Sequence, residues 1–278
     1  MTASRPGIST DSIVRSRVYA VSNQKGGVGK TTTAINLGTA LAAVGRRVLI
    51  IDFDPQGNAS TGLGIDGNER QNSTYRLLHR EITIKEAATP AKMVRNLYVV
   101  PSTVELSGID AELMGEDDGR YRLKNALFGD KAQYFNALGL DYVLIDCPPS
   151  LNLLTVNAMA AAHGVIVPLQ CEFFALEGLT QLLKTIQRIR RNMNPQLSIQ
   201  GVILTMFDKR HRSCSEVAET ARAELGHLIY ETVVPRNVRI AEAPSHGLPA
   251  LMYDPGSLGS QSYVQLATEF LEREHDVV

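Results

Sequence analysis

A glycine-rich segment with two lysines carries the strongest chemical signal in this chain. Residues 22–33 read SNQKGGVGKTTT. Glycine has no Cβ, so backbone N–H groups in such a segment can approach phosphate oxygens closely. Lys30 would reach the β- and γ-phosphates of a nucleotide, and the hydroxyl of Thr31 would ligate Mg²⁺. The segment therefore predicts a site for nucleotide phosphates.

The first of the two lysines, Lys25, sets the segment apart from ordinary phosphate loops. The usual pattern is GxxxxGK[ST], and Gln24 stands where that pattern has its first glycine. Lys25 comes just before Gly26 and Gly27. Two lysines around one loop supply more positive charge than one nucleotide needs from one subunit. This excess indicates a nucleotide held between two copies of the protein.

The residues on either side provide the structural context that a phosphate loop needs. Residues 18–21 form a short β-prone run, and after Lys30 apolar residues recur at helical spacing until Gly45. A helix that starts at the loop adds N–H donors and a partial positive charge for an anion. The alternative is an ordinary glycine-rich turn with a chance lysine. The order of strand, loop and helix favours the phosphate site.

Carboxylates follow two further strand-like runs. Asp146 ends the run at residues 143–145, where it would hold Mg²⁺ through a water, since this ion keeps several of its waters. Asp52 and Asp54 lie at the end of the run at 48–51 and share one face by the two-residue period of a strand. The alternative for each is a strand-end carboxylate that caps a loop. These residues predict a magnesium site beside the phosphates.

Several separate segments resemble one protein family. Residues 25–31, KGGVGKT, resemble the deviant Walker A loop, KGGxGK[ST]. Residues 52–60, DFDPQGNAS, resemble a segment of the ParA/Soj partition ATPases, and residues 146–150, DCPPS, resemble the end of their Walker B motif. Residues 170–178 and 235–245 are similar to further blocks of that family. The order and length of these motifs make the resemblance specific from about Val18 to the last helix.

The resemblance implies ATP or ADP and Mg²⁺ as cofactors and gives roles to individual residues. The implied catalytic residues are Lys25, which crosses to the partner's phosphates, Lys30, and Asp54, which positions the attacking water. Thr31, Asp54 and Asp146 would hold Mg²⁺, partly through water, with Asp52 nearby. The residues expected to contact the nucleotide are Lys25, Gly26, Gly27, Val28, Gly29, Lys30, Thr31, Thr32 and, around the base, Asp208, Pro235, Arg236 and Asn237.

The function that the resemblance implies is ATP-dependent partitioning of a chromosome or plasmid. An ATP-bound homodimer would bind non-specific double-stranded DNA, and hydrolysis stimulated by a ParB-like centromere-binding protein would release it. Such a protein is cytoplasmic and associated with the nucleoid. The net charge of -1 shows no global basic balance, so a local patch must contact DNA. Arg210 and Arg239 match family positions implicated in that contact, and a solvated charged surface is the alternative.

Three other functions compete with this interpretation. A membrane-cycling ATPase of the MinD kind needs a basic amphipathic C-terminal helix, but residues 265–276 are acidic. A cluster-bridging reductase like the nitrogenase iron protein needs suitably placed cysteines, and Cys147, Cys171 and Cys214 show no CxxC pair. A binding module without turnover would not need the full set of lysines, threonine and aspartates.

Length and composition predict one large intracellular domain. The chain has 278 residues, of which 44% are hydrophobic, enough for a sizeable core. Residues 1–17 are polar, do not form a signal peptide and are expected to be a flexible arm. No run of about 18 apolar residues exists that would span a membrane. We expect residues 18–278 to form a single P-loop ATPase domain.

Seven strand-like apolar runs alternate with helical patterns along the chain. They lie at residues 18–21, 48–51, 97–100, 142–145, 165–169, 199–204 and 229–234. Near-continuous apolar strands separated by helices predict a mostly parallel sheet that is covered on both faces, a doubly wound α/β fold. Ligands bind at the carboxyl ends of strands in such sheets. The glycine-rich segment, Asp52, Asp54 and Asp146 all follow strand ends, as this rule requires.

Overall fold

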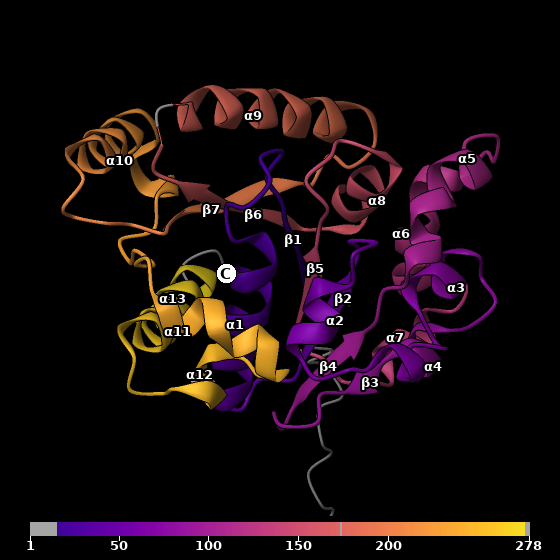
Figure 1. The fold of residues 1–278 in the computed structure, drawn as a ribbon. Coiled ribbons are helices and arrows are strands. Elements are labelled where there is room, and N and C mark those ends of the chain that lie inside the picture. Colours follow the sequence, from indigo (N-terminus) through magenta and orange to yellow (C-terminus); the bar gives the residue numbers. More distant parts are fainter. Residues whose placement is uncertain (1–15, 173, 276–278) are drawn as a thin grey trace, which may run out of the picture.

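A mixed sheet of seven strands forms the centre of the molecule in a computed structural model that describes residues 16–172 and 174–275 (Figure 1). The strand order is β3-β4-β2-β5-β1-β6-β7. All neighbouring strands pair in parallel except β3, which runs antiparallel to β4. The strands are β1 (Arg17–Val21), β2 (Val48–Asp52), β3 (Thr89–Pro90), β4 (Leu97–Val100), β5 (Tyr142–Asp146), β6 (Gly164–Gln170) and β7 (Ser198–Thr205).

Helices cover both faces of this sheet (Figure 1). The helices that pack on one face are α3 (Thr74–Leu78), α5 (Ile109–Leu113), α6 (Arg122–Phe128), α8 (Leu153–Ala161), α9 (Ala175–Asn192) and α10 (Arg212–Leu225). Those on the other face include α1 (Lys30–Ala43), α2 (Asn58–Gly62) and α13 (Leu258–His275). Shorter helices at the periphery are α4 (Ile84–Ala87), α7 (Ala132–Asn136), α11 (Val238–Glu242) and α12 (Ala250–Tyr253).

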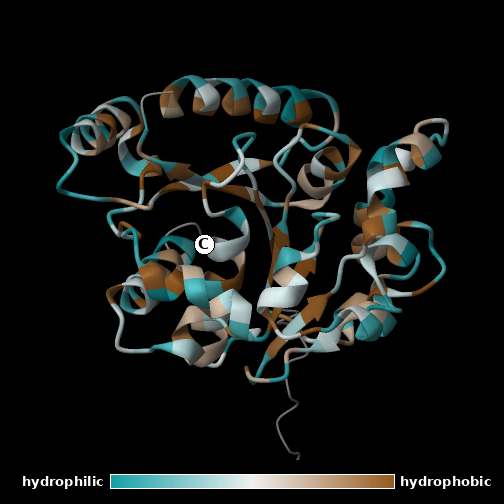
Figure 2. Ribbon diagram, viewed as in Figure 1, coloured by the Kyte–Doolittle hydropathy of each residue, from teal (hydrophilic) through white to brown (hydrophobic). Residues whose placement is uncertain are grey.

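Alternation along the strands divides the hydrophobic core into two halves. In β1, Val18 and Ala20 join the cluster under α8 and α9, whereas Tyr19 and Val21 join the one under α1 and α13. This follows from the two-residue period of a strand, which sends neighbouring side chains to opposite faces. Figure 2 shows apolar strands between helices whose outer faces are hydrophilic. The predicted doubly wound fold is confirmed.

The strand predicted at residues 229–234 is wrong. The segment runs beside β7, but only two isolated bridges join it there, Val202 to Ile229 and Phe207 to Pro235. The antiparallel strand β3 was not predicted, because two residues that end in Pro90 carry no strand pattern. The other six predicted strands are present, with ends that differ by a residue or two.

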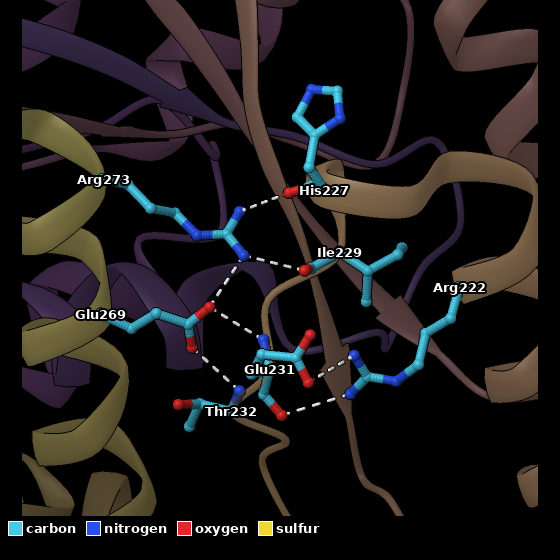
Figure 3. Close-up of polar contacts among 7 residues, drawn as sticks. All are labelled: Arg222, His227, Ile229, Glu231, Thr232, Glu269 and Arg273. Carbon is cyan, nitrogen blue, oxygen red and sulfur yellow. Dashed lines mark hydrogen bonds and ion pairs between the residues drawn. The ribbon is translucent and has the colours of Figure 1, made fainter. Parts of the chain in front are cut away.

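A carboxylate on α13 accepts hydrogen bonds from the backbone of the segment beside β7 (Figure 3). Glu269 accepts hydrogen bonds from the backbone N–H groups of Glu231 at 2.8 Å and Thr232 at 2.9 Å. Arg273 donates to the same carboxylate and to the carbonyl of Ile229, both at 2.8 Å. Side chains of α13 thus satisfy groups that a strand neighbour would otherwise have paired.

The C-terminal helix α13 packs its apolar face into the core. Tyr263, Leu266 and Phe270 are almost fully buried, and the Phe270 ring meets those of Tyr19 and Tyr142 edge-on at 5.3 and 5.4 Å. This face is therefore not free to lie in a membrane surface, which such anchoring helices require. None of the helices within the described residues has both the length and the apolar character needed to cross a membrane.

The proposed arm at residues 1–17 lies, apart from its last two residues, outside the described part of the chain. Arg17 is the first residue of β1, and Ser16 donates a hydrogen bond to the carbonyl of Leu140 at 2.8 Å. The folded domain therefore begins no later than Ser16.

Replacing Glu269 with Gln should lower the free energy of unfolding by about 1–2 kcal/mol at neutral pH, because one acceptor oxygen and the charge beside Arg273 are lost. Burial alone would raise the pKa of Glu269, but the N–H groups of Thr232 and Glu231 hold it below the usual 4.5. The stabilisation by the Glu269 carboxylate should therefore be fully present above the usual pKa of 4.5. It should decline as the pH falls through the lowered pKa of the folded protein. Urea unfolding at two pH values measures both effects.

The matched control is Glu272→Gln, which removes the same charge from an exposed position of the same helix. We expect it to change stability by less than about 0.5 kcal/mol. Equal losses in the two variants would contradict the anchoring role of Glu269.

Candidate nucleotide-binding site

The strand register brings the predicted site residues to one edge of the sheet. Asp146 at the end of β5 lies opposite both Val21, the last residue of β1, and Asp52, the last residue of β2. Val21 in turn lies opposite Ile166 of β6. The glycine-rich loop leaves β1 at this edge, so it faces the carboxylates across adjacent strands. This is the carboxyl edge, where open parallel sheets bind ligands.

The loop between β1 and α1 has the shape of a phosphate cradle. Gly27 and Gly29 have φ angles of 75° and 87°, which side chains with a Cβ rarely adopt. A Cβ added to Gly26 or Gly27 would meet nothing within 4 Å, so the loop is open on its outer side. Val28 is buried, and its carbonyl accepts a hydrogen bond from Thr205 at 2.9 Å. The loop is therefore anchored to β7 through Val28 and accessible to a ligand at Gly26 and Gly27.

The two lysines of the loop have different surroundings. Lys30 is only 7% exposed, and its ammonium donates to the carbonyl of Lys25 at 3.0 Å. Burial lowers the pKa of Lys30, and the negative charges of Asp146 and Asp54 partly oppose this shift. Lys25 lies on the surface and forms an ion pair with Glu172. Lys30 thus points into the cradle, and Lys25 is held at its rim.

Asp146 has the properties of a metal-site carboxylate. It is fully buried, and neither of its oxygens has a hydrogen-bond partner in the described chain. Thr31 lies beside this carboxylate without forming a hydrogen bond of good geometry. Burial raises the pKa of Asp146 well above its usual value, and the charges of Asp52 and Asp54 add to the shift. A buried carboxylate without a donor fits a cation, so Thr31 and Asp146 are suited to Mg²⁺.

The two aspartates after β2 have separate roles. Asp52 is buried and accepts hydrogen bonds from the N–H and hydroxyl of Ser60, at 2.8 and 2.6 Å. Burial raises its pKa to about 6, although the bonds from Ser60 oppose the shift. Asp54 is half-buried and accepts only from the N–H of Gln56 among the described residues, at 3.0 Å. Asp52 therefore anchors the loop, as the capping alternative has it, and the Asp54 carboxylate keeps acceptor capacity for a ligand or water.

The residues predicted around the base lie on two linked segments after β7. Phe207 bridges to Pro235, and the N–H of Arg236 donates to the carbonyl of Phe207 at 3.2 Å. The side chain of Asn237 caps α11 by accepting from Arg239 and Ile240. Asp208 is engaged by Arg210, which lowers its pKa. Contact between these four residues and a nucleotide stays a prediction.

The two arginines predicted to bind DNA are exposed but internally paired. Arg210 is 86% exposed and contacts Asp208 through Nε and Nη2, at 2.9 and 2.6 Å. Arg239 is 51% exposed and pairs with Glu242 at 3.0 Å and Asp254 at 3.3 Å. Both sit on the segments that Phe207 and Pro235 join, so the two basic clusters start from neighbouring positions. Each arginine would have to exchange a carboxylate for a phosphate.

Three residues that position the site escaped the sequence analysis. Glu172, just after β6, pairs with Lys25. Asn23 accepts from the N–H of Lys25 at 3.0 Å and donates to the carbonyl of Pro168 at 2.8 Å. Thr205 ends β7 and supports the loop through Val28. All three stand at the carboxyl ends of strands, and that common position was the signal available in the sequence.

Cys147 follows Asp146 at the end of β5. Its thiol is buried, and burial next to the charge of Asp146 raises its pKa. A thiol of this kind behaves as a small apolar group. This favours the packing role over the metal-cluster alternative.

Comparisons with known proteins agree with this geometry. A family model described as an AAA domain matches residues 16–199. The chain is 55% identical to chromosome partitioning protein ParA of Caulobacter vibrioides over 260 residues, 94% of this chain and 96% of that protein. It is 47% identical to chromosome-partitioning ATPase Soj of Treponema pallidum over 254 residues, 91% of this chain and 96% of that one.

Among solved structures, cobyrinic acid a,c-diamide synthase of Mycobacterium smegmatis with bound ADP and magnesium is similar, with a TM-score of 0.79 and 34% identity. The match covers 95% of this chain and 97% of that one. The resemblance drawn from the motifs is confirmed. The chain belongs to the ParA/Soj family of chromosome-partitioning ATPases.

Proposed function

We propose that this chain drives DNA partitioning through an ATP-dependent homodimer that binds non-specific double-stranded DNA on the nucleoid. As a member of its family it is a magnesium-dependent ATPase. A ParB-like centromere-binding protein would stimulate hydrolysis and so release the dimer from DNA. The observation that carries the proposal is that Lys30, Thr31 and Asp146, all buried or half-buried, lie at one edge of the sheet beside an exposed second lysine.

The chain's own groups account for binding and orientation of the nucleotide. The N–H groups of the loop from Gly26 to Gly29 would cradle the phosphates, and the ammonium of Lys30 would leave the Lys25 carbonyl to contact them. Thr31 and Asp146 would hold Mg²⁺, which neutralises charge on the phosphates when bound. Asp54 would accept a hydrogen bond from the attacking water and orient it in line. Hydrolysis of this kind depends mainly on positioning and charge neutralisation.

Lys25 is exposed at the rim of the cradle, where a second subunit could receive it. Its charge exceeds what its own site needs, since Lys30 already points inward. We place Lys25 against the phosphates of the partner, which makes each site incomplete without the other copy. ATP would favour the dimer because the γ-phosphate is the group that two lysines can share. The two nucleotide states would then differ in DNA affinity.

Replacing Asp54 with Ala should leave ATP binding nearly unchanged and lower the hydrolysis rate by a factor of about 100 or more, because the oriented water is lost. The measurement pairs nucleotide affinity by fluorescence titration with single-turnover hydrolysis. Unchanged turnover would remove Asp54 from the mechanism.

Replacing Lys25 with Ala should retain ATP binding and abolish ATP-dependent dimerisation. The side chain is exposed and makes few contacts in its own subunit, so the fold should be intact. Sedimentation velocity with a non-hydrolysable ATP analogue and Mg²⁺ measures the effect. A variant that dimerises like the wild type would disprove the role of Lys25 in trans.

The DNA-binding cycle is tested with DNA of arbitrary sequence at low salt, with ATP, ADP or no nucleotide. We expect salt-sensitive binding with ATP alone, since phosphate contacts by arginine are sequence-independent and release counterions. Arg210→Glu combined with Arg239→Glu should abolish binding and keep the nucleotide affinity. Arg95→Glu with Arg120→Glu changes the net charge equally at exposed positions elsewhere and should bind normally. Equal losses in both double variants would refute the assigned patch.

A further inference from the structure

Lys25, which we propose contacts the partner subunit, makes three hydrogen bonds or ion pairs within its own subunit. The N–H of Lys25 donates to the side chain of Asn23 at 3.0 Å. Its carbonyl accepts from the ammonium of Lys30 at 3.0 Å. Its own ammonium forms an ion pair with Glu172, which is 147 residues further along the chain. The orientation of Lys25 is thus set by its own subunit before any partner arrives.

Glu172 is itself held in place, so the pair is not a chance meeting of two mobile side chains. Its N–H donates to the carbonyl of Gln170 at 2.8 Å, and its carbonyl accepts from Ala175, the first residue of α9, also at 2.8 Å. The Gln170 amide donates to the second carboxylate oxygen of Glu172. Glu172, just after β6, therefore presents to Lys25 a carboxylate that the Gln170 amide also holds.

The ion pair between Lys25 and Glu172 is weak enough to be exchanged for another contact. The Lys25 side chain is 41% exposed and that of Glu172 47%, so solvent and salt screen their attraction. Nucleotide would draw the Lys30 ammonium from the Lys25 carbonyl to the phosphates, which removes one tie on the Lys25 backbone. Glu172 then remains as the tie on the Lys25 side chain. A partner's γ-phosphate offers a higher negative charge than one carboxylate and can replace it.

We propose that Glu172 is a positioning residue that holds Lys25 in its own subunit and competes with the partner's phosphates for it. The inference rests on the proposed role of Lys25 in trans. Without a partner, the pair keeps Lys25 away from the phosphates of its own subunit. On dimerisation both subunits give up this ion pair, so the carboxylate of Glu172 raises the protein concentration at which the ATP-bound dimer forms.

The test compares Glu172→Gln with Glu177→Gln, a neutralisation of an exposed carboxylate in the first turn of α9. An exposed ion pair changes an equilibrium constant about 1.5- to 5-fold, and two pairs are lost per dimer. Glu172→Gln should therefore lower the dimer dissociation constant roughly 2- to 25-fold at low salt. Glu177→Gln should leave it unchanged. The probe is a non-hydrolysable ATP analogue with Mg²⁺, read by sedimentation velocity.

Salt and a second variant separate the outcomes. The gain in Glu172→Gln should shrink as the ionic strength rises, because screening weakens the pair that the variant removes. A higher dissociation constant in Glu172→Gln would mean that the carboxylate stabilises the dimer, and an unchanged one would mean that it does not compete. Either result overturns the inference. Lys25→Ala measured alongside isolates the proposed function, which fails only if that variant dimerises like the wild type.

Discussion

The register of parallel strands is the constraint on which the rest of this structure depends. Asp146 faces Val21 on one side and Asp52 on the other, so the first phosphate-loop residues and both strand-end carboxylates meet within one sheet edge. A shift of one residue in either pairing would turn Asp146 or Asp52 to the opposite face. Successive side chains of β1, β2 and β5 enter two different core clusters, and the close packing of each set against its own layer of helices holds this register. Packing in the core thereby places the glycine-rich loop beside the two carboxylates.

Two buried carboxylates, Asp52 and Asp146, lie at this edge of the sheet. Among the described residues, only Asp52 has hydrogen-bond donors. The N–H and hydroxyl of Ser60 donate to Asp52 and offset part of the cost of its burial. Asp146 has no such donor, and a buried carboxylate without one is costly. In the proposed function Mg²⁺ would supply what is missing, and binding that is confined to the folded state stabilises the fold. Ligand binding at Asp146, if it occurs as proposed, would therefore stabilise the fold, whereas Asp52 already has donors within the chain.

Most of the fold and the centre of the site could be predicted because their signals are local. Gly27 and Gly29 mark positions that need positive φ, and the strand ends before Asp52 and Asp146 follow from apolar runs that are continuous in the sequence. The ion pair between Lys25 and Glu172 joins residues that are far apart in the chain, so no local sequence pattern predicts it. The segment at 229–234 has the composition of a strand, but the Glu269 carboxylate on α13 accepts from two of its N–H groups. The misses thus come from side chains that meet only in three dimensions.

The segment beside β7 also affects whether another chain can add a strand to this edge of the sheet. An edge strand with free N–H and C=O groups is a template on which another chain can add a strand. Here residues 229–235 lie along the outer side of β7, and the N–H groups of Tyr230 and Val234 donate to the carbonyls of Val202 and Leu204. Strand addition at this edge would first have to displace the segment and its bonds to Glu269 and Arg273 (Figure 3). The outer edge of β7 is thereby covered, and strand addition from another chain is blocked there.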